Sequence, residues 1–310
     1  FAIVTFLLPP TMRLVFHSDI PVSIVTVASM VFSGLVVPIM GVWTDRRPWT
    51  KLMLVWGTAL CVSCCFAMAF ILAAALGWPS SVPDPKLPLP DFAWLYLVGV
   101  CVLFFLANAS YETVLMFYNS LMVIVAEPRH WGMISGLGVA VGYGGSLFAL
   151  GALTVAGVTF VPSAIVLAGI SFLVFTLPLL FFVPERTVSP EMAKERTDLL
   201  GPLKEIVTAV KKLPSNRPLF LGLLGNFLCV DALNTLILFL TTYLLKTVFI
   251  GNSPLDQPVK MMMVGLILSA VGWSFINGWL STKIGSIPSL FFAGVMLVVA
   301  LIFEIGRAHV

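Results

Sequence analysis

The segment 41–51 reads Gly-Val-Trp-Thr-Asp-Arg-Arg-Pro-Trp-Thr-Lys and separates two long apolar runs. Charged side chains between such runs must reach water, and an excess of Lys and Arg on short loops marks the cytoplasmic side of a membrane protein. We therefore expect a charged cytoplasmic loop here. The segment 278–285, Gly-Trp-Leu-Ser-Thr-Lys-Ile-Gly, also follows a long apolar run. Two such segments in corresponding positions predict a chain built from two related halves.

The composition places the chain in a lipid bilayer. Of its 310 residues 59% are apolar and 10% are charged, and the mean hydropathy is +1.06. A soluble globule of this size would lack the polar side chains needed to cover its surface. The apolar runs are continuous, whereas the strands of a β-barrel alternate in polarity. We therefore predict an all-α polytopic membrane protein.

A helix crosses the hydrocarbon core with about 20 apolar residues, and eight runs meet this requirement. The expected spans, preceded by the tail of a first helix at 1–10, are 20–41, 51–78, 92–126, 133–157, 162–184, 219–245, 261–280 and 287–303. The polar segment 185–218 carries seven basic and five acidic residues and apolar residues at helical spacing. It reads as a cytoplasmic linker with an interfacial amphipathic helix.

These spans predict an N-terminal bundle at 1–184, the linker at 185–218 and an incomplete C-terminal bundle at 219–303. The chain begins without Met inside an expected helix and stops soon after an apolar run, so we expect a fragment. Residues 304–310 read Glu-Ile-Gly-Arg-Ala-His-Val and resemble the translation of a sequencing adapter. We leave this tail out of the fold prediction; the alternative is a natural polar tail.

The positive charges predict the orientation of the spans. Twelve Lys and Arg fall on the side of the 41–51 loop and four on the opposite side. This bias places the 41–51 loop in the cytoplasm.

Two segments of this chain resemble metal-binding or cofactor-binding motifs, but each lacks residues or structure that such a site requires. Cys61-x-x-Cys64-Cys65 lies in an apolar run without a nearby His, and structural zinc needs four ligands, so buried small hydrophobic residues are the better interpretation. Gly136-x-Gly138 lacks the preceding strand of a dinucleotide site. We expect no metal, no other cofactor and no enzyme, because catalytic elbows and phosphate loops are also missing from the sequence.

Six spans, a charged cytoplasmic linker and a Gly-x-x-x-Asp-Arg-Arg segment together resemble the major facilitator superfamily of transporters. Gly41, Asp45, Arg46 and Arg47 fill the family's loop pattern, and Pro48 lies near the position of an expected Gly. The second segment keeps Gly278, Lys283 and Gly285 but has Ser281 and Thr282 where an Asp is frequent. The resemblance implies a helical bundle of 12 helices, of which this chain would hold the tail of helix 1 through helix 9.

Finer motifs resemble one branch, the vacuole-effluxer or autophagy-related protein 22-like transporters. Residues 117–121 read Phe-Tyr-Asn-Ser-Leu, residues 134–138 read Ile-Ser-Gly-Leu-Gly, and residues 226–228 read Asn-Phe-Leu. Ala232 stands where that branch usually has Gly. Members of the branch export amino acids from the vacuole, so the resemblance implies amino acid efflux as one candidate activity.

Asp231 is the strongest candidate for substrate or proton coupling. It lies twelve residues into its run, about 18 Å deep at 1.5 Å per residue, and so near the bilayer midplane. A charged group there is costly and therefore functional by default. Asn234 and Thr235 share its helical face. The alternative is a buried polar contact with another helix.

Asn108, Glu112 and Asn119 form one stripe on the long fourth run, because they fall within about 40° at 100° per residue. Glu112 lies near the cytoplasmic boundary, which favours gating by a switchable contact with Arg46, Arg47 or Arg129; a structural ion pair is the alternative. Asn108 lies one turn deeper and is the better substrate contact.

The remaining gating candidates belong to the two related segments. Asp45 can accept backbone N–H groups at the start of the next helix and pair with Arg46 or Arg47. Gly41 and Lys283 complete the gating set, together with Glu112 and Asn119.

The leading hypothesis is a secondary active transporter that moves a small solute by alternating access. The alternatives are a membrane-embedded enzyme or assembly factor, and a channel. The expected partners are the lipid bilayer and a small-molecule substrate, with protons as one candidate for the coupling ion. We expect no nucleic acid, because the net charge of +3 is small. A bacterial inner membrane and a vacuolar membrane fit the hydropathy equally well.

Overall fold

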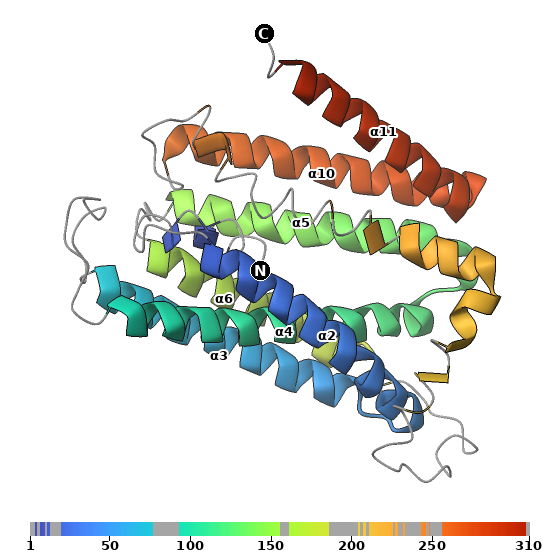
Figure 1. Ribbon diagram of the computed structural model, residues 1–310, viewed down its shortest axis with the longest axis horizontal. Coiled ribbons are helices and arrows are strands. Elements are labelled where there is room, and N and C mark those ends of the chain that lie inside the picture. The colour runs from blue at the N-terminus through green and yellow to red at the C-terminus, as the bar shows by residue number, and fades with distance from the viewer. Residues whose placement is uncertain are drawn as a thin grey trace. The chain divides into compact units, whose positions relative to one another are not determined.

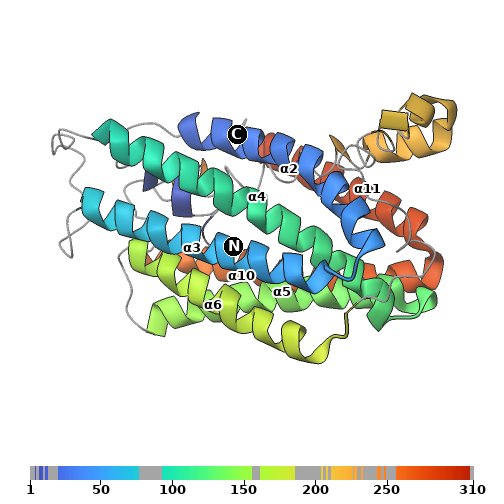
Figure 2. The same ribbon diagram turned by 90° about the horizontal axis from the view of Figure 1, so that it is seen from below.

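The computed structural model describes five continuous stretches: 20–76, 93–155, 161–185, 211–225 and 256–307. It also describes residues 4, 7–9, 11, 12, 204, 207, 208, 227, 228, 232, 243–245 and 248. The long helices are α2 (Ile20–Arg46), α3 (Thr50–Leu76), α4 (Ala93–Val125), α5 (Trp131–Val155), α6 (Val161–Phe182), α10 (Gln257–Ile284) and α11 (Ser286–Arg307). The described residues contain no β-strand, and the helical turn Pro128–His130 lies between α4 and α5 (Figures 1 and 2). The predicted all-α class is confirmed.

Six of these helices are long and apolar enough to cross a membrane. Many of their large apolar side chains are exposed, for example Val31, Phe70 and Phe181. Such surfaces suit contact with lipid chains, where an exposed apolar side chain costs nothing. The expected span 219–245 lies partly outside the described residues.

The helix ends correct the sequence prediction at both charged segments. Residues 41–46, expected in a loop, continue α2, and the turn is confined to 47–49. Nothing between 42 and 46 removes a backbone donor, and the Thr44 hydroxyl donates to Gly41 O at 3.0 Å. Likewise α10 runs through Ile284 and stops at Gly285, whose φ of +94° favours glycine. At the C-terminal end, α11 continues to Arg307, into the segment set aside as a tail.

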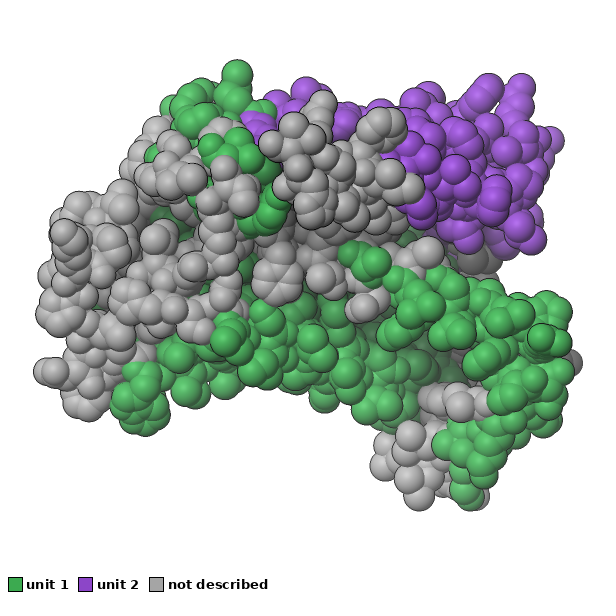
Figure 3. Space-filling view, turned by 45° about the horizontal axis from the view of Figure 1, so that its top comes forward, with its two compact units in different colours: residues 1–121, 149–261 green, residues 122–148, 262–310 purple. Residues whose placement is uncertain are grey.

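The described chain divides into two compact units, coloured green and purple in Figure 3. Unit 1 comprises Phe1–Leu121 and Ala149–Met261. In it α3 packs along α6, and α4 contributes Val114, Phe117 and Leu121 to a buried cluster with Leu54 of α3. A Cβ on Gly57 would lie 2.6 Å from Val114 Cγ2, and one on Gly169 would lie 2.8 Å from Phe66 Cε1. These glycines allow α3 to approach both neighbouring helices closely.

Unit 2 comprises Met122–Phe148 and Met262–Val310. Its centre is a crossing of α5 and α10 at which the two backbones touch. A Cβ on Gly136 would lie 2.6 Å from both Gly278 Cα and Ser274 O, and one on Gly278 would lie 2.9 Å from Gly136 Cα. One turn along, a Cβ on Gly132 would lie 2.8 Å from Ser281 Oγ. Small residues therefore set the separation of these helices. The predicted division of the chain at 184 and 218 stays a prediction.

We predict that Gly136→Ala destabilises the protein by about 1–3 kcal/mol, because the added methyl group overpacks a backbone contact. Gly142→Ala on the same helix is the matched control, since a Cβ there would meet nothing within 4 Å. The control should be neutral or stabilising, because Ala is the better helix former. Thermal unfolding of the purified protein in detergent distinguishes the two variants. Equal melting temperatures would contradict the observed crossing.

Candidate functional site

The cytoplasmic ends predicted for α3 and α6 are joined by a reciprocal polar contact within unit 1. The backbone N–H of Lys51 donates to the Glu185 carboxylate, at 3.0 Å to Oε2 and 3.3 Å to Oε1. The Lys51 ammonium group donates to Leu180 O at 3.0 Å. We call this set, Lys51 with Glu185 and Leu180, the α3–α6 clamp. It connects Lys51, the second residue after the 47–49 turn, with Glu185, the first residue of the 185–218 linker.

The clamp supplies to each helix the charge that its own sequence lacks. The first turn of α3 contains no acidic residue and the last turn of α6 contains no basic one. Thr50, a good N-cap residue type, has a buried hydroxyl that finds no hydrogen-bond partner in the described part of the chain. Glu185 therefore provides the negative charge at the N-terminus of α3, and Lys51 provides the positive charge at the C-terminus of α6. Both charges stabilise the helix ends that they contact.

The predicted gating loop is only partly visible beside this clamp. The side chains of Asp45 and Arg46 lie outside the described residues. Arg47 is exposed and places its guanidinium carbon 4.6 Å from the centre of the Trp49 ring. At Gly41 a Cβ would lie 3.9 Å from Met116 Cε of α4. The described part of this segment thus combines the last turns of α2 with one cation–ring contact, between Arg47 and Trp49.

The predicted stripe on α4 passes from a buried to an exposed environment. Asn108 is 6% exposed, Glu112 is half-buried, and Asn119 is exposed. Glu112 has no hydrogen-bond or ion-pair partner in the part of the chain that the structure describes. The gating role of this stripe stays a prediction.

Asn108 joins α4 to α2 in the interior of unit 1. Its Nδ2 donates to Ser29 Oγ at 2.8 Å, and Ser29 Oγ in turn donates to Thr26 O at 2.8 Å. Elsewhere in unit 1, the hydroxyls of Ser33 on α2 and Thr58 on α3 are buried without a hydrogen-bond partner among the described residues. A buried polar group usually has a protein or water partner, so these two hydroxyls have unused hydrogen-bonding capacity within the described part of the unit.

The remaining predicted residues lie elsewhere. Asp231, Asn234 and Thr235 lie outside the described residues. Lys283, in the last turn of α10 in unit 2, places its ammonium nitrogen 5.4 Å from the centre of the Trp279 ring. Among the described residues, no group of His, Cys, Asp and Glu could hold a metal ion.

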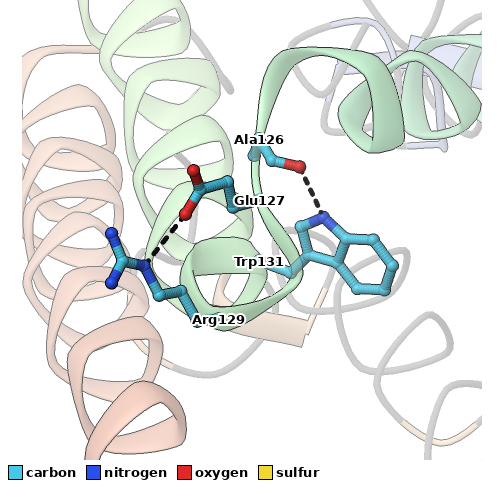
Figure 4. Close-up of polar contacts among 4 residues, drawn as sticks. All are labelled: Ala126, Glu127, Arg129 and Trp131. Atoms are coloured by element: carbon cyan, nitrogen blue, oxygen red, sulfur yellow. Dashed lines mark hydrogen bonds and ion pairs between the residues drawn. The ribbon is translucent and has the colours of Figure 1, made fainter.

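The turn between α4 and α5 belongs to unit 2 and is closed by local contacts (Figure 4). Arg129 Nε lies 3.0 Å from Glu127 Oε2, and Trp131 Nε1 donates to Ala126 O at 3.0 Å. The Arg129 and Glu127 side chains are 76% and 69% exposed. Arg129, which the sequence suggests as a partner for Glu112, is thus paired with Glu127 in this structure.

Sequence reasoning missed two contacts. Glu185 was assigned only to the linker, although its position directly after an apolar run and a Pro could have indicated a helix-end role. Gly278 was noted as part of a loop pattern, although the spacing Ser274, Gly278, Ser281 is a helix-crossing signal.

Comparisons with known proteins give one family. The family model of the Major Facilitator Superfamily matches residues 1–304. An uncharacterized protein of Aquifex aeolicus (strain VF5) is 25% identical over 180 residues, which cover 58% of this chain and 42% of that protein. An uncharacterized MFS-type transporter of Bacillus subtilis (strain 168), YxiO, is 26% identical over 168 residues, which cover 50% of this chain and 38% of that protein. The matched regions thus span about two fifths of these relatives' lengths. No solved structure matches the chain significantly.

We predict that Glu185→Gln lowers the free energy of unfolding by about 1–2 kcal/mol, because it removes a charge-assisted bond at the N-terminus of α3. Glu127→Gln is the matched control, since its ion pair is exposed. Such pairs contribute about 0–1 kcal/mol, so the control should change little. Denaturant unfolding of both variants in detergent makes the comparison. A Glu185→Gln variant as stable as the parent would show that the clamp adds no stability.

Proposed function

The chain belongs to the Major Facilitator Superfamily, and from this premise we propose that the whole protein is a secondary active transporter of a small solute. The main support for this proposal is the match to the family model over residues 1–304. Six apolar helices of membrane-spanning length agree with it. In this proposal two helical bundles alternate in access around a central site. The given sequence contains no ATP-binding motif, so in this proposal a gradient of an ion or of the solute itself supplies the driving force.

We assign gating to the loop pattern and its neighbours: Gly41, Asp45, Arg46, Arg47, Glu112, Asn119 and Lys283. Support comes from the clamp, which holds the start of α3 beside the end of α6. The half-buried Glu112 carboxylate, unpaired within the described chain, gives further support. It can accept a cation in a second state of the transporter and so bias one state over the other.

We assign substrate or proton coupling to Asp231, Asn234, Thr235 and Asn108. The support for Asp231 is its depth in the sequence pattern, because a carboxylate near the midplane is retained only where it acts. Support for Asn108 is its buried contact with Ser29 between α4 and α2.

Amino acid efflux is the substrate hypothesis, and it rests on the resemblance to vacuole effluxers. A bacterial inner membrane or a vacuolar membrane would host such a transporter. A membrane-embedded enzyme or assembly factor, or a channel, would not concentrate a solute against its gradient. Gradient-dependent accumulation therefore separates the proposed transporter from these alternatives.

We predict that the full-length protein in liposomes exchanges amino acids in a manner that depends on an imposed pH gradient. Asp231→Asn should abolish the gradient-dependent part, because the amide cannot take up and release a proton. Asp198→Asn, a carboxylate of the polar linker, is the control and should transport normally. Radiolabelled amino acid flux is the measurement. If no amino acid moves, the substrate hypothesis fails; if Asp231→Asn keeps coupled flux, the coupling assignment fails.

We also predict that Asp45→Ala lowers the transport rate on the order of tenfold, which corresponds to about 1.4 kcal/mol in the rate-limiting barrier. The expected reason is the loss of the carboxylate that the sequence pattern assigns as an acceptor for backbone N–H groups at the start of α3 and for Arg side chains. Protein abundance in the membrane should be unchanged. Glu127→Ala, on the next cytoplasmic turn, is the control. Transport at the parental rate in Asp45→Ala would remove this residue from the gate.

A further inference from the structure

The charges of the 185–218 linker are segregated along its length. Residues 185–198 contain three basic and four acidic side chains. Residues 204–217 contain four basic side chains and one acidic one, Glu205, which leaves four minus one, a net charge of +3. We call this second part the basic segment; its cations are Lys204, Lys211, Lys212 and Arg217. It directly precedes the apolar residues 219–225.

The four cations of the basic segment are all exposed. None of them has an ion-pair partner among the described residues. Lys211 and Lys212 precede a helical turn, Leu213–Ser215, and Arg217 follows it. Asn216 then starts the next helix, because its carbonyl accepts from Phe220 N at 2.9 Å. The cations therefore flank a turn that presents them to the surroundings of the protein.

Exposed apolar side chains follow immediately. Leu219, Phe220, Leu221, Leu223 and Leu224 are between 39% and 54% exposed. Cations followed within a few residues by an exposed apolar helix match the order of layers in a bilayer, with headgroups before hydrocarbon. In both views of unit 1 the gold helical pieces of this region lie at the end where α2 terminates (Figures 1 and 2). The basic segment thus shares the end of unit 1 that carries the gating loop.

We propose that the basic segment is an anionic-lipid binding surface, with Lys204, Lys211, Lys212 and Arg217 contacting negatively charged headgroups. The argument is charge complementarity. Anionic lipids attract basic side chains placed next to a membrane-spanning helix, whereas zwitterionic lipids carry no net charge to attract them. The acid-balanced part, 185–198, lacks this attraction. The surface goes beyond the transport proposal and does not depend on it.

The test uses the full-length protein in detergent, with Ser215→Cys carrying an environment-sensitive fluorophore. Ser215 is exposed in the turn between the cations, whereas Cys61, Cys64 and Cys65 are buried. Solubilised phosphatidylglycerol should give a saturable fluorescence change and phosphatidylcholine should not. Lys211→Gln should weaken the apparent affinity about fivefold, and neutralising all four cations more than a hundredfold. A higher salt concentration should also weaken the apparent affinity for phosphatidylglycerol, because ions screen the attraction between the charges.

The matched control replaces Arg186, Lys194 and Arg196 with Gln, which removes nearly as many cations from the same linker. Its affinity for phosphatidylglycerol should be unchanged. The proposal is overturned by equal binding of both lipids, by full affinity in the four-cation variant, or by an equal loss in the control. Saturation by inorganic phosphate at the same concentration would also overturn it, because a free anion would then suffice. If the four-cation variant fails to fold, Lys211→Gln decides alone.

Discussion

In hydrocarbon, a backbone N–H or C=O group can be satisfied only by another group of the protein, and this constraint governs every part of the structure. Helices meet it along their length, so the difficulty is concentrated where they end. Each end described here has its own solution. Glu185 and Lys51 serve two helices at once, the Trp131 indole serves Ala126 O, and Gly285 stops α10 in a conformation suited to glycine.

The same constraint explains why glycine carries much of the packing. Lipid is as apolar as the helix surfaces, so burial in itself gives helices little reason to associate. Close backbone contact provides the missing attraction through dispersion. The crossing of α5 and α10 at Gly136 and Gly278 and the approach of α3 to α4 at Gly57 are examples in the two units. Both positions would be overlooked in a search for large hydrophobic residues.

The fold could be predicted from the sequence because run length and continuity are direct consequences of bilayer thickness. Helix ends could not: residues 44–46 are polar or charged, yet polar residues at a membrane surface remain helical when nothing breaks the hydrogen-bond ladder. Glu185 was missed because its partner is 134 positions away in the sequence, beyond any local pattern. Asn108 was found from its helical stripe, although its contact with Ser29 was not. Asp231 stays a prediction from depth alone.

The clamp has a further consequence for how the chain tolerates change. Glu185 is bound by the backbone N–H of residue 51, a group that nineteen of the twenty amino acids possess. Sequence drift at this position can remove the contact of Nζ with Leu180 O while leaving the carboxylate held in place. Proline alone would delete the donor. The informative site in related sequences is therefore the acid after α6, and residue 51 can vary widely without loss of the link.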